Sequence, residues 1–364
     1  MGTIMTSDKL QSIYSELAET SVPDLAGVTL ADIVQLQETS AGLQALLRLG
    51  VYNPALCANL EQCLADIGAR HEAEVTTAWV VDVPGSSRAT ATASLANVKN
   101  IVAVASGKGG VGKSTTSVNL ALALAADGAK VGLLDADIYG PSQPHMLGVG
   151  DQRPQMHAAN VMAPIEAHGI KLLSMGNLVT EKTPMVWRGP MASGALQQLL
   201  NNTHWGALDY LVVDMPPGTG DIQLTLSQSV PLAGAVVVTT PQDIALLDAK
   251  KGIEMFTKVD VPVLGVVENM STHTCSNCGH TEAIFGELGG DQLAAEYGVG
   301  LLGRLPLAMS IRAQTDSGQP PVAAEPESAV AAEYFSIARK VALSLWQLAA
   351  NASNAGPMIS ITDD

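Results

Sequence analysis

Residues 107–115, with the sequence GKGGVGKST, constrain the fold of this chain more than any other feature. They satisfy the pattern GxxxxGK[ST], follow an apolar run at 101–105 and open a helical pattern that continues through Val118, Leu120 and Leu122. A strand, a glycine-rich turn and a helix in that order are the context of a phosphate-binding loop. The sequence therefore predicts an α/β domain that binds a nucleotide at the end of a strand.

The residue types in this loop suit phosphate binding. Glycines let backbone N–H groups curl around the phosphates, and the start of the helix adds a partial positive charge. We expect Lys113 to reach the β- and γ-phosphates and Ser114 to give its hydroxyl to Mg²⁺. The predicted nucleotide-binding residues of the loop are Gly107, Lys108, Gly109, Gly110, Val111, Gly112, Lys113, Ser114 and Thr115.

Lys108 is a second lysine, placed near the start of the loop. The loop turns away from it, so it cannot easily reach the phosphate that its own chain binds. The sequence KGGVGKST fits the deviant form of the motif, KGGxGK[ST], in which this lysine crosses a dimer interface to the nucleotide of the partner. The pattern favours that role over a solvated loop lysine.

Carboxylates follow two further apolar runs. Asp135 and Asp137 lie in LLDADIYGPS after the run 131–134, and Asp214 ends YLVVD before MPPGTGD. Ligands of open α/β sheets bind at the carboxyl ends of the strands. An Asp after four apolar residues is typical of the Walker B position that holds the hydration shell of Mg²⁺, so Asp214 is expected there.

The order of apolar runs predicts an α/β fold with a mostly parallel sheet covered by helices on both faces. We expect a small α/β domain at 1–83, a linker at 84–97, a P-loop NTPase domain at 98–350 and a flexible tail at 351–364. The strands expected in the larger domain are 101–105, 131–134, 170–173, 210–213, 235–238 and 263–267.

Composition narrows the function classes. The chain has 364 residues, of which 47% are hydrophobic, so a large core can form. Its net charge of −16 argues against general nucleic-acid binding, which needs clustered Lys and Arg. No stretch approaches about 18 consecutive apolar residues, and the N-terminus does not resemble a signal peptide. These features predict a cytoplasmic protein that binds neither nucleic acid nor membrane.

The four cysteines fall into two groups. Cys57 and Cys63 lie on the apolar side of an expected helix and are interpreted as buried small hydrophobic residues. Cys275 and Cys278 form CSNCGH and are the candidate metal ligands. The spacing fits a zinc knuckle completed by His273 and His280, a redox dithiol, or half of an iron–sulfur site. Each chain offers two close thiolates, whereas a [4Fe–4S] cluster takes four.

Several motifs together resemble the Mrp/ApbC iron–sulfur cluster carriers, P-loop ATPases related to MinD, ParA and the nitrogenase iron protein. The resemblance covers roughly residues 98–345. The motifs that carry it are SGKGGVGKST, LDADIYGPS, MVWRGPM, DYLVVDMPPGTGD, VENMS followed by CSNCG, and IFGELGG with LGRLPL.

The resemblance implies a slow, Mg²⁺-dependent ATPase whose homodimer bridges a [4Fe–4S] cluster and passes it to apoproteins. Cys275 and Cys278 would hold the cluster, and Lys108 would act in trans. Asp137 would orient the attacking water, whereas Asp135 and Asp214 would act around Mg²⁺. Asn269 would contact the edge of the adenine.

Residues 1–83 resemble, more weakly, the iron–sulfur assembly domain that is often fused in front of these carriers. That domain commonly has a Cys where this chain has Asn53, so we interpret 1–83 as a docking or regulatory module. Two alternatives stay open for the whole chain. One is a positioning ATPase of the ParA/MinD kind, and the other is a zinc-stabilised ATPase without a cluster.

Overall fold

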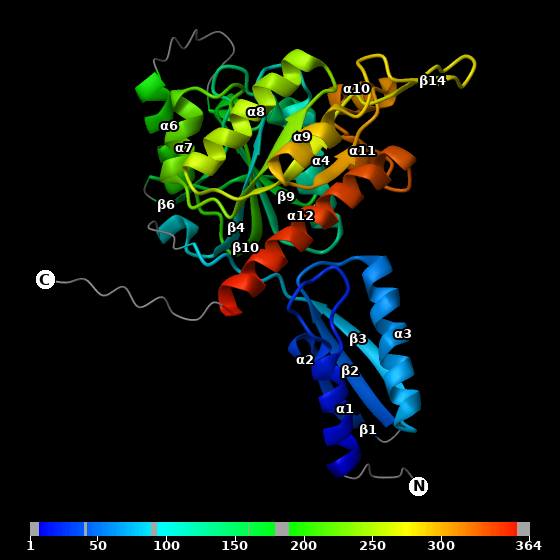
Figure 1. Cartoon of the computed structure of the whole chain (residues 1–364). Coiled ribbons are helices and arrows are strands. Elements are labelled where there is room, and N and C mark those ends of the chain that lie inside the picture. The colour runs from blue at the N-terminus through cyan, green and yellow to red at the C-terminus, as the bar shows by residue number, and fades with distance from the viewer. Residues whose placement is uncertain (1–6, 40–41, 89–92, 159, 179–188, 355–364) are drawn as a thin grey trace, which may run out of the picture. The chain divides into compact units, whose positions relative to one another are not determined.

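The computed structural model describes residues 7–39, 42–88, 93–158, 160–178 and 189–354. Their contacts form two compact units (Figure 1), one made of 1–84 with 342–364 and one of 85–341. The sequence predicted that the larger domain would run to residue 350. The chain after Val341 instead groups with the smaller unit, in which Gln347 donates a hydrogen bond to the carbonyl oxygen of Ala26 at 2.7 Å.

The smaller unit has a three-stranded sheet in the order β1-β2-β3. β1 (Val34–Thr39) is antiparallel to β2 (Gly42–Leu49), and β3 (Val75–Val81) is parallel to β2. Its helices are α1 (Ser7–Glu19), α2 (Leu30–Ile33) and α3 (Pro54–Arg70). As the Asn-Pro pair predicts, Asn53 caps α3 by accepting a hydrogen bond from the N–H of Ala55 at 3.1 Å.

The larger unit is built on an eight-stranded sheet in the order β15-β12-β11-β4-β10-β5-β9-β8. All neighbouring pairs are parallel except β8 with β9, so the prediction of a mostly parallel sheet is confirmed. All six strands expected from the sequence are present. The strands are β4 (Val98–Ala105), β5 (Val131–Asp135), β8 (Ile165–Ala167), β9 (Ile170–Ser174), β10 (Leu208–Asp214), β11 (Gly234–Thr239), β12 (Val263–Glu268) and β15 (Leu301–Arg304).

Helices cover both faces of this sheet (Figure 1). Both faces of β4 are buried, as a strand covered by helices on each side requires. Ile101 and Ala103 face a core cluster with α6–α9, whereas Val102 and Val104 are buried on the opposite face. There α4 packs under the central strands, and Ile337 of α12 lies against Gly303 of β15. These helices are α4 (Lys113–Ala126), α6 (Gly189–Asn201), α7 (Asp221–Ser229), α8 (Asp243–Lys258), α9 (Gly289–Tyr297) and α12 (Ala329–Asn354).

The remaining elements are short or peripheral. The shorter helices are η1 (Ala93–Leu95), α5 (Gln143–Met146), η2 (Met175–Asn177), α10 (Met309–Asp316) and α11 (Pro321–Ala324). Two small hairpins pair β6 (Met156–Ala158) with β7 (Val161–Met162), and β13 (His273–Thr274) with β14 (Thr281–Glu282). The end of the predicted linker is part of the fold, since Leu95 is fully buried in the core of the larger unit.

Two expectations fall partly or wholly outside the described residues. Of the MVWRGPM motif, 185–188 lie outside them, and its last three residues begin α6. Most of the predicted tail, 355–364, also lies outside them.

Candidate functional site

Sheet register brings the predicted nucleotide-site residues together at the carboxyl ends of the strands. Asp214 at the end of β10 is the register partner of Asp135 at the end of β5. Lys113 begins α4, directly after the loop that leaves the neighbouring strand β4. Residues from three separate parts of the chain therefore meet at one edge of the sheet.

The loop itself is tightly packed. Gly107 approaches the backbone of Asp248 in α8 so closely that a Cβ atom at this position would lie 2.2 Å from the Asp248 carbonyl oxygen. Gly112 has a φ of +85° and caps α4, a conformation that favours glycine. Gly109 and Gly110 are exposed.

Lys113 and Asp214 form a buried ion pair. The Lys113 Nζ lies 2.6 Å from Asp214 Oδ1, and the two side chains are 6% and 0% exposed. Lys113 also donates a hydrogen bond to Ser114 Oγ at 3.1 Å, and Ser117 Oγ donates one to Asp214 Oδ1 at 2.8 Å. The ammonium group that is predicted to meet the phosphates is thus paired with Asp214, the predicted Walker B carboxylate.

Asp135 is fully buried and accepts several hydrogen bonds. Its Oδ2 accepts from Ser174 Oγ at 3.0 Å and from the backbone N–H groups of Ser142 and Gln143 at 3.0 and 3.1 Å. Burial, reinforced by the nearby Asp214 carboxylate, raises the pKa of Asp135 to about 7. Asp135 therefore organises the segment after β5 and does not face open solvent.

Asp137 and Lys108 are more accessible. Asp137 is half-buried, and its Oδ1 accepts a hydrogen bond from the N–H of Gly140 at 3.3 Å. Burial raises its pKa, whereas the positive charge of Lys113 acts in the opposite direction. Lys108 is half-buried, and Ser106 Oγ donates to its carbonyl oxygen at 2.8 Å. The roles of Asp137 in orienting water and of Lys108 in trans stay predictions.

Gln143 is a residue of this cluster that the sequence analysis missed. Its fully buried side chain donates from Nε2 to Asp214 Oδ2 at 2.8 Å and to the Ser114 carbonyl oxygen at 3.0 Å. Its Oε1 is buried and has no hydrogen-bond partner. The position after LDADIYGPS was the only available signal, because a glutamine carries no motif of its own.

Oxygen donors in this cluster fit Mg²⁺. They comprise the Ser114 hydroxyl, the Asp214 carboxylate and the unpartnered Gln143 Oε1, and Mg²⁺ prefers such hard ligands together with nucleotide phosphates. In the described part of the chain, no group of three or more His, Cys, Asp and Glu side chains is placed to hold a metal ion.

Asn269 follows β12 and contacts the phosphate loop. Its Nδ2 donates a hydrogen bond to the Val111 carbonyl oxygen at 2.8 Å, and its side chain is buried. A Cβ atom at Gly112 would lie 2.0 Å from this Nδ2. The predicted adenine contact of Asn269 stays a prediction, and the amide has a second role in holding the loop.

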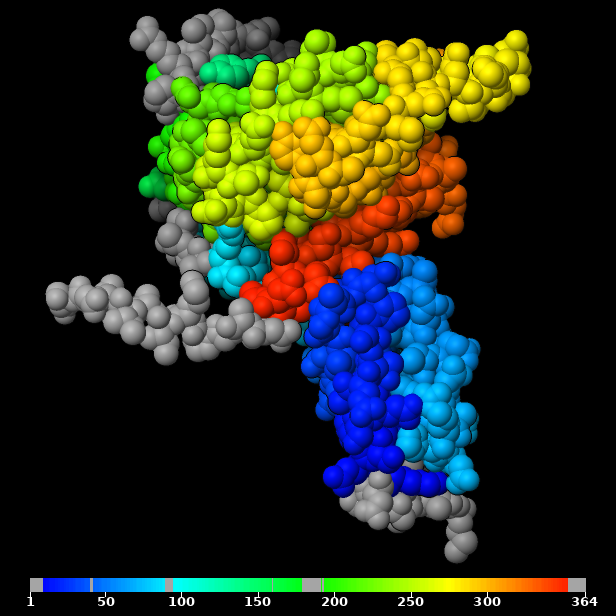
Figure 2. All heavy atoms as spheres, viewed as in Figure 1, coloured from blue at the N-terminus to red at the C-terminus, as the bar shows by residue number. Residues whose placement is uncertain are grey.

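Cys275 and Cys278 lie in the turn between β13 and β14, a hairpin that stands out from the surface in Figure 2, where the chain is coloured yellow. Cys275 is half-buried and Cys278 is exposed. The backbone N–H groups of Asn277 and Cys278 hold the pKa of the Cys275 thiol below its usual range. A low pKa favours the thiolate, which is the form that binds metal.

The zinc knuckle considered from the sequence is not assembled here. The His273 side chain contacts the segment after β15, where its Nδ1 donates a hydrogen bond to the Leu307 carbonyl oxygen at 3.0 Å. No group of three or more ligating side chains forms around the two thiols within the described residues. Cys57 is buried and Cys63 is half-buried in α3 of the smaller unit, in agreement with their interpretation as packing residues.

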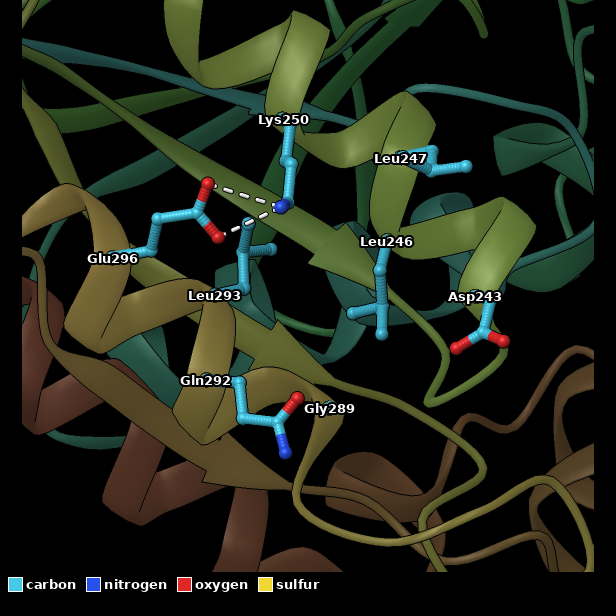
Figure 3. Close-up of a pocket in the computed structure, with 8 residues that line it drawn as sticks. All are labelled: Asp243, Leu246, Leu247, Lys250, Gly289, Gln292, Leu293 and Glu296. Atoms are coloured by element: carbon cyan, nitrogen blue, oxygen red, sulfur yellow. Dashed lines mark hydrogen bonds and ion pairs between the residues drawn. The ribbon is translucent and has the colours of Figure 1, made fainter.

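A separate cavity of about 260 Å³ lies between α8 and α9 (Figure 3). Leu246, Leu247 and Leu293 line it, and Lys250 pairs with Glu296 at 2.7 Å. None of its lining residues belongs to the predicted nucleotide or metal sites.

A GxxxxGK[ST] loop between a central parallel strand, β4, and the helix α4 defines a P-loop NTPase. Residues 97–342 match the family described as NUBPL iron-transfer P-loop NTPase, in the ParA group. This match covers more than half of the chain, and the chain belongs to that family.

Curated relatives are similar over most of their length. The chain is 65% identical over 245 residues to an iron–sulfur cluster carrier protein of Pseudomonas fragi, covering 67% of this chain and 85% of the relative. It is 58% identical over 304 residues to a protein of that name from Salmonella typhimurium, covering 82% of this chain and 81% of the relative.

Solved structures share the fold. A nucleotide-binding protein from Archaeoglobus fulgidus in complex with ADP is 36% identical with a TM-score of 0.57, covering 64% of this chain and 91% of that one. The cell division ATPase MinD of Pyrococcus furiosus is 24% identical with a TM-score of 0.51, and the match covers 66% of this chain and 98% of that one. The likeness to MinD concerns the fold alone. Among the described helices of our chain, none has the length and apolar character needed to cross a bilayer.

Proposed function

We propose that this protein is a cytoplasmic, ATP-dependent iron–sulfur cluster carrier. It binds ATP with Mg²⁺, hydrolyses it slowly, and as a homodimer holds a [4Fe–4S] cluster that it passes to apoproteins. Membership of the iron-transfer P-loop NTPases and the names of the curated relatives support this function. The single observation that carries it is the pair of accessible thiols, Cys275 and Cys278, on a projecting hairpin of the nucleotide-binding unit.

Ligand number supports the dimer. A [4Fe–4S] cluster takes four thiolates, and the hairpin of one chain offers two. Cys57 and Cys63 lie in α3 of the other unit, one of them buried. Two hairpins, one from each chain, therefore supply the missing ligands most simply, with the cluster as exchangeable cargo between them.

The nucleotide site supports slow hydrolysis. On nucleotide binding, the Lys113 ammonium group would exchange Asp214 for the β- and γ-phosphates. The Ser114 hydroxyl would help to hold Mg²⁺, which would supply positive charge to neutralise the phosphates. Asp137 is near enough to solvent to orient a water molecule. Lys108 of the partner subunit supplies a second positive charge, so hydrolysis depends on the dimer.

The test is iron content after anaerobic reconstitution of four variants, Cys57→Ala, Cys63→Ala, Cys275→Ala and Cys278→Ala. We expect about four irons per wild-type dimer, and loss of iron only in the Cys275 and Cys278 variants. ATP affinity, measured by calorimetry, should stay unchanged in all four. The Cys57 and Cys63 variants are the matched controls, since they remove a thiol outside the hairpin.

Other outcomes would contradict the proposal. Equal loss of iron in the Cys57 or Cys63 variants would place the smaller unit in the metal site. A colourless protein that binds zinc in place of iron and sulfide would favour the zinc-stabilised ATPase instead.

A further inference from the structure

The side chain of Gln143 joins the two residues that are predicted to hold Mg²⁺. Its Nε2 donates a hydrogen bond to Asp214 Oδ2 at 2.8 Å and another to the Ser114 carbonyl oxygen at 3.0 Å. Ser114 lies in the first turn of α4, whereas Asp214 ends β10, the strand beside β4. One buried amide therefore ties together two groups that come from different elements.

The orientation of this amide follows from its neighbours. Both atoms that Nε2 contacts are acceptors, a carboxylate oxygen and a carbonyl oxygen, and only the NH₂ end of an amide can donate to them. A flipped amide would place Oε1 against two oxygen atoms. The Gln143 Oε1 is therefore the end that is left over, and it is buried without a hydrogen-bond partner among the described residues.

A buried polar atom without a partner is not by itself a sign of a ligand site. In the described part of the chain, four side chains have such an atom: Ser94 Oγ, Gln143 Oε1, Asn177 Oδ1 and Trp205 Nε1. Of these four, Gln143 is the one whose side chain bonds to residues of the predicted nucleotide site. An acceptor that loses water on burial and gains no partner is costly, so its place beside this site calls for a donor that arrives with the ligand.

Asp214 has one acceptor position left, on the oxygen that Gln143 contacts. A carboxylate has about four such positions, two on each oxygen. Oδ1 accepts from Lys113 Nζ at 2.6 Å and from Ser117 Oγ at 2.8 Å, which uses both of its positions. Among the described residues, the donor to Oδ2 is Gln143 Nε2, so one position on Oδ2 stays available.

The two available acceptors lie close enough to share one water molecule. The dimensions of an amide place Gln143 Oε1 at most about 5 Å from Asp214 Oδ2. A water molecule that donates to both oxygens fits this separation, since each such hydrogen bond is about 2.7–2.8 Å long. Mg²⁺ usually keeps several of its water molecules when it binds to a protein.

The backbone of Gln143 is anchored independently of its side chain. Its N–H donates to Asp135 Oδ2 at 3.1 Å, and the N–H of Ser142 donates to the same oxygen at 3.0 Å. Gln143 is the first residue of α5, and Pro144 follows it in the first turn. The amide is thus presented from a backbone that Asp135 holds, as the precise positioning of a ligand requires.

We propose that Gln143 is a positioning residue for the divalent cation of the nucleotide site. Its Nε2 holds the Asp214 carboxylate and the Ser114 backbone in place, and its Oε1 accepts a hydrogen bond from a water molecule of the cation. The inference rests on the proposed function, because it requires that ATP binds with Mg²⁺. Mg²⁺ demands near-octahedral geometry, whereas the coordination of Ca²⁺ is flexible, so loss of Gln143 affects Mg²⁺ more than Ca²⁺.

The test compares ATP affinity with and without the cation, by calorimetry on the iron-free full chain. The ratio of the Kd in EDTA to the Kd with saturating Mg²⁺ measures the interaction of the cation with the protein. Gln143→Met keeps the length of the side chain and removes the amide. In this variant the ratio should fall by about tenfold, a usual size for loss of a group that orients a metal ligand. The Kd in EDTA should stay within about threefold of the wild-type value, and with Ca²⁺ in place of Mg²⁺ the ratio should fall by less than about threefold.

Asn177→Leu is the matched control. Asn177 is also fully buried, and its Nδ2 donates to the carbonyl oxygens of Val149 at 3.0 Å and Gln152 at 3.1 Å. Its Oδ1 has no partner among the described residues, as for Gln143. Neither Val149 nor Gln152 belongs to the predicted nucleotide site, so this variant should keep the wild-type Mg²⁺ ratio.

A second variant, Gln143→Asn, keeps an amide in the buried site but shortens the side chain by one methylene. It cannot make both hydrogen bonds of Gln143 Nε2, so its Mg²⁺ ratio should fall as in Gln143→Met. Circular dichroism of each variant checks that it is folded.

A folded Gln143→Met or Gln143→Asn chain with the wild-type Mg²⁺ ratio would overturn the inference. Equal loss of ATP affinity in EDTA and in Mg²⁺ would also overturn it, because Gln143 would then only maintain the shape of the loop. Absence of ATP binding by the wild type would instead defeat the proposed function.

Discussion

The phosphate loop and the Cys275–Cys278 hairpin belong to the same unit but are built in opposite ways. At the loop, the side chain of Lys113 is buried and paired with the buried carboxylate of Asp214 from β10. In the hairpin, Cys278 is exposed and Cys275 half-buried, and the turn is closed by backbone bonds such as that from the Cys275 N–H to the His280 carbonyl oxygen at 2.8 Å.

This difference reflects what each ligand needs. Nucleotide phosphates supply much of the coordination of Mg²⁺, so one chain with a few oxygen donors is sufficient. A [4Fe–4S] cluster needs four thiolates, and one hairpin has two. We therefore expect the loop to bind its ligand within one chain and the hairpin to require a second copy. The following changes test that contrast.

Lys113→Ala should have the largest effect. It removes charge-assisted bonds to two phosphates, each worth about 2 kcal/mol, so the Kd for ATP should rise by roughly a thousandfold. Calorimetry of ATP binding checks this, with circular dichroism as the control for folding. Iron loading of the hairpin should remain near the wild-type level, and its loss would show that the two regions are not separable.

Asp137→Asn should slow hydrolysis by about a hundredfold and leave ATP affinity within about threefold. The carboxylate is expected to orient water and not to hold the phosphates. Single-turnover hydrolysis together with calorimetry separates the two quantities. A variant that hydrolyses ATP at the wild-type rate would move this role away from Asp137.

Lys108→Ala should reduce hydrolysis by about fivefold, because a half-exposed charge is partly screened by solvent and contributes about 1 kcal/mol. Mixing this chain with Lys113→Ala chains sharpens the test. In a mixed dimer, only the Lys108→Ala subunit binds ATP, and the partner's Lys108 faces that nucleotide. Recovery of the wild-type rate per bound nucleotide supports action in trans, whereas the rate of the Lys108→Ala homodimer would place Lys108 in cis.

Asp135→Asn should change the pH dependence of stability. The pKa of Asp135 is about 7 in the folded chain against 3.8 for the ordinary group. The folded state therefore keeps a proton that the unfolded state releases, so the stability from this carboxyl is present below its ordinary pKa and is lost as the pH rises through about 7. The Asn variant should lose less stability between about pH 5 and about pH 8, measured by urea unfolding without nucleotide. An equal loss of stability over this pH range in the wild type and the Asn variant would contradict the raised pKa of Asp135.

Sequence patterns predicted the central strands well and the edges poorly. Buried runs such as 210–213 are apolar on both faces and fall in β10, whereas β8 and β15 are short edge strands without such a run. β1 was also missed, because its residues VQLQET are mostly exposed and give little apolar alternation. Strand edges depend on neighbours more than on their own composition.

The site divides in the same manner. The sequence alone determined the phosphate loop, the cap of α3 by Asn53 and the carboxylates that end β5 and β10, because each depends on residues close together in the chain. Only the tertiary structure decided that Asp135 lies beside Asp214, that Gln143 bonds to Asp214 and Ser114, and that Asn269 holds the loop at Val111. These contacts join residues from 29 to 158 positions apart. Their partners are set by sheet order and burial, and no local pattern of residues records them.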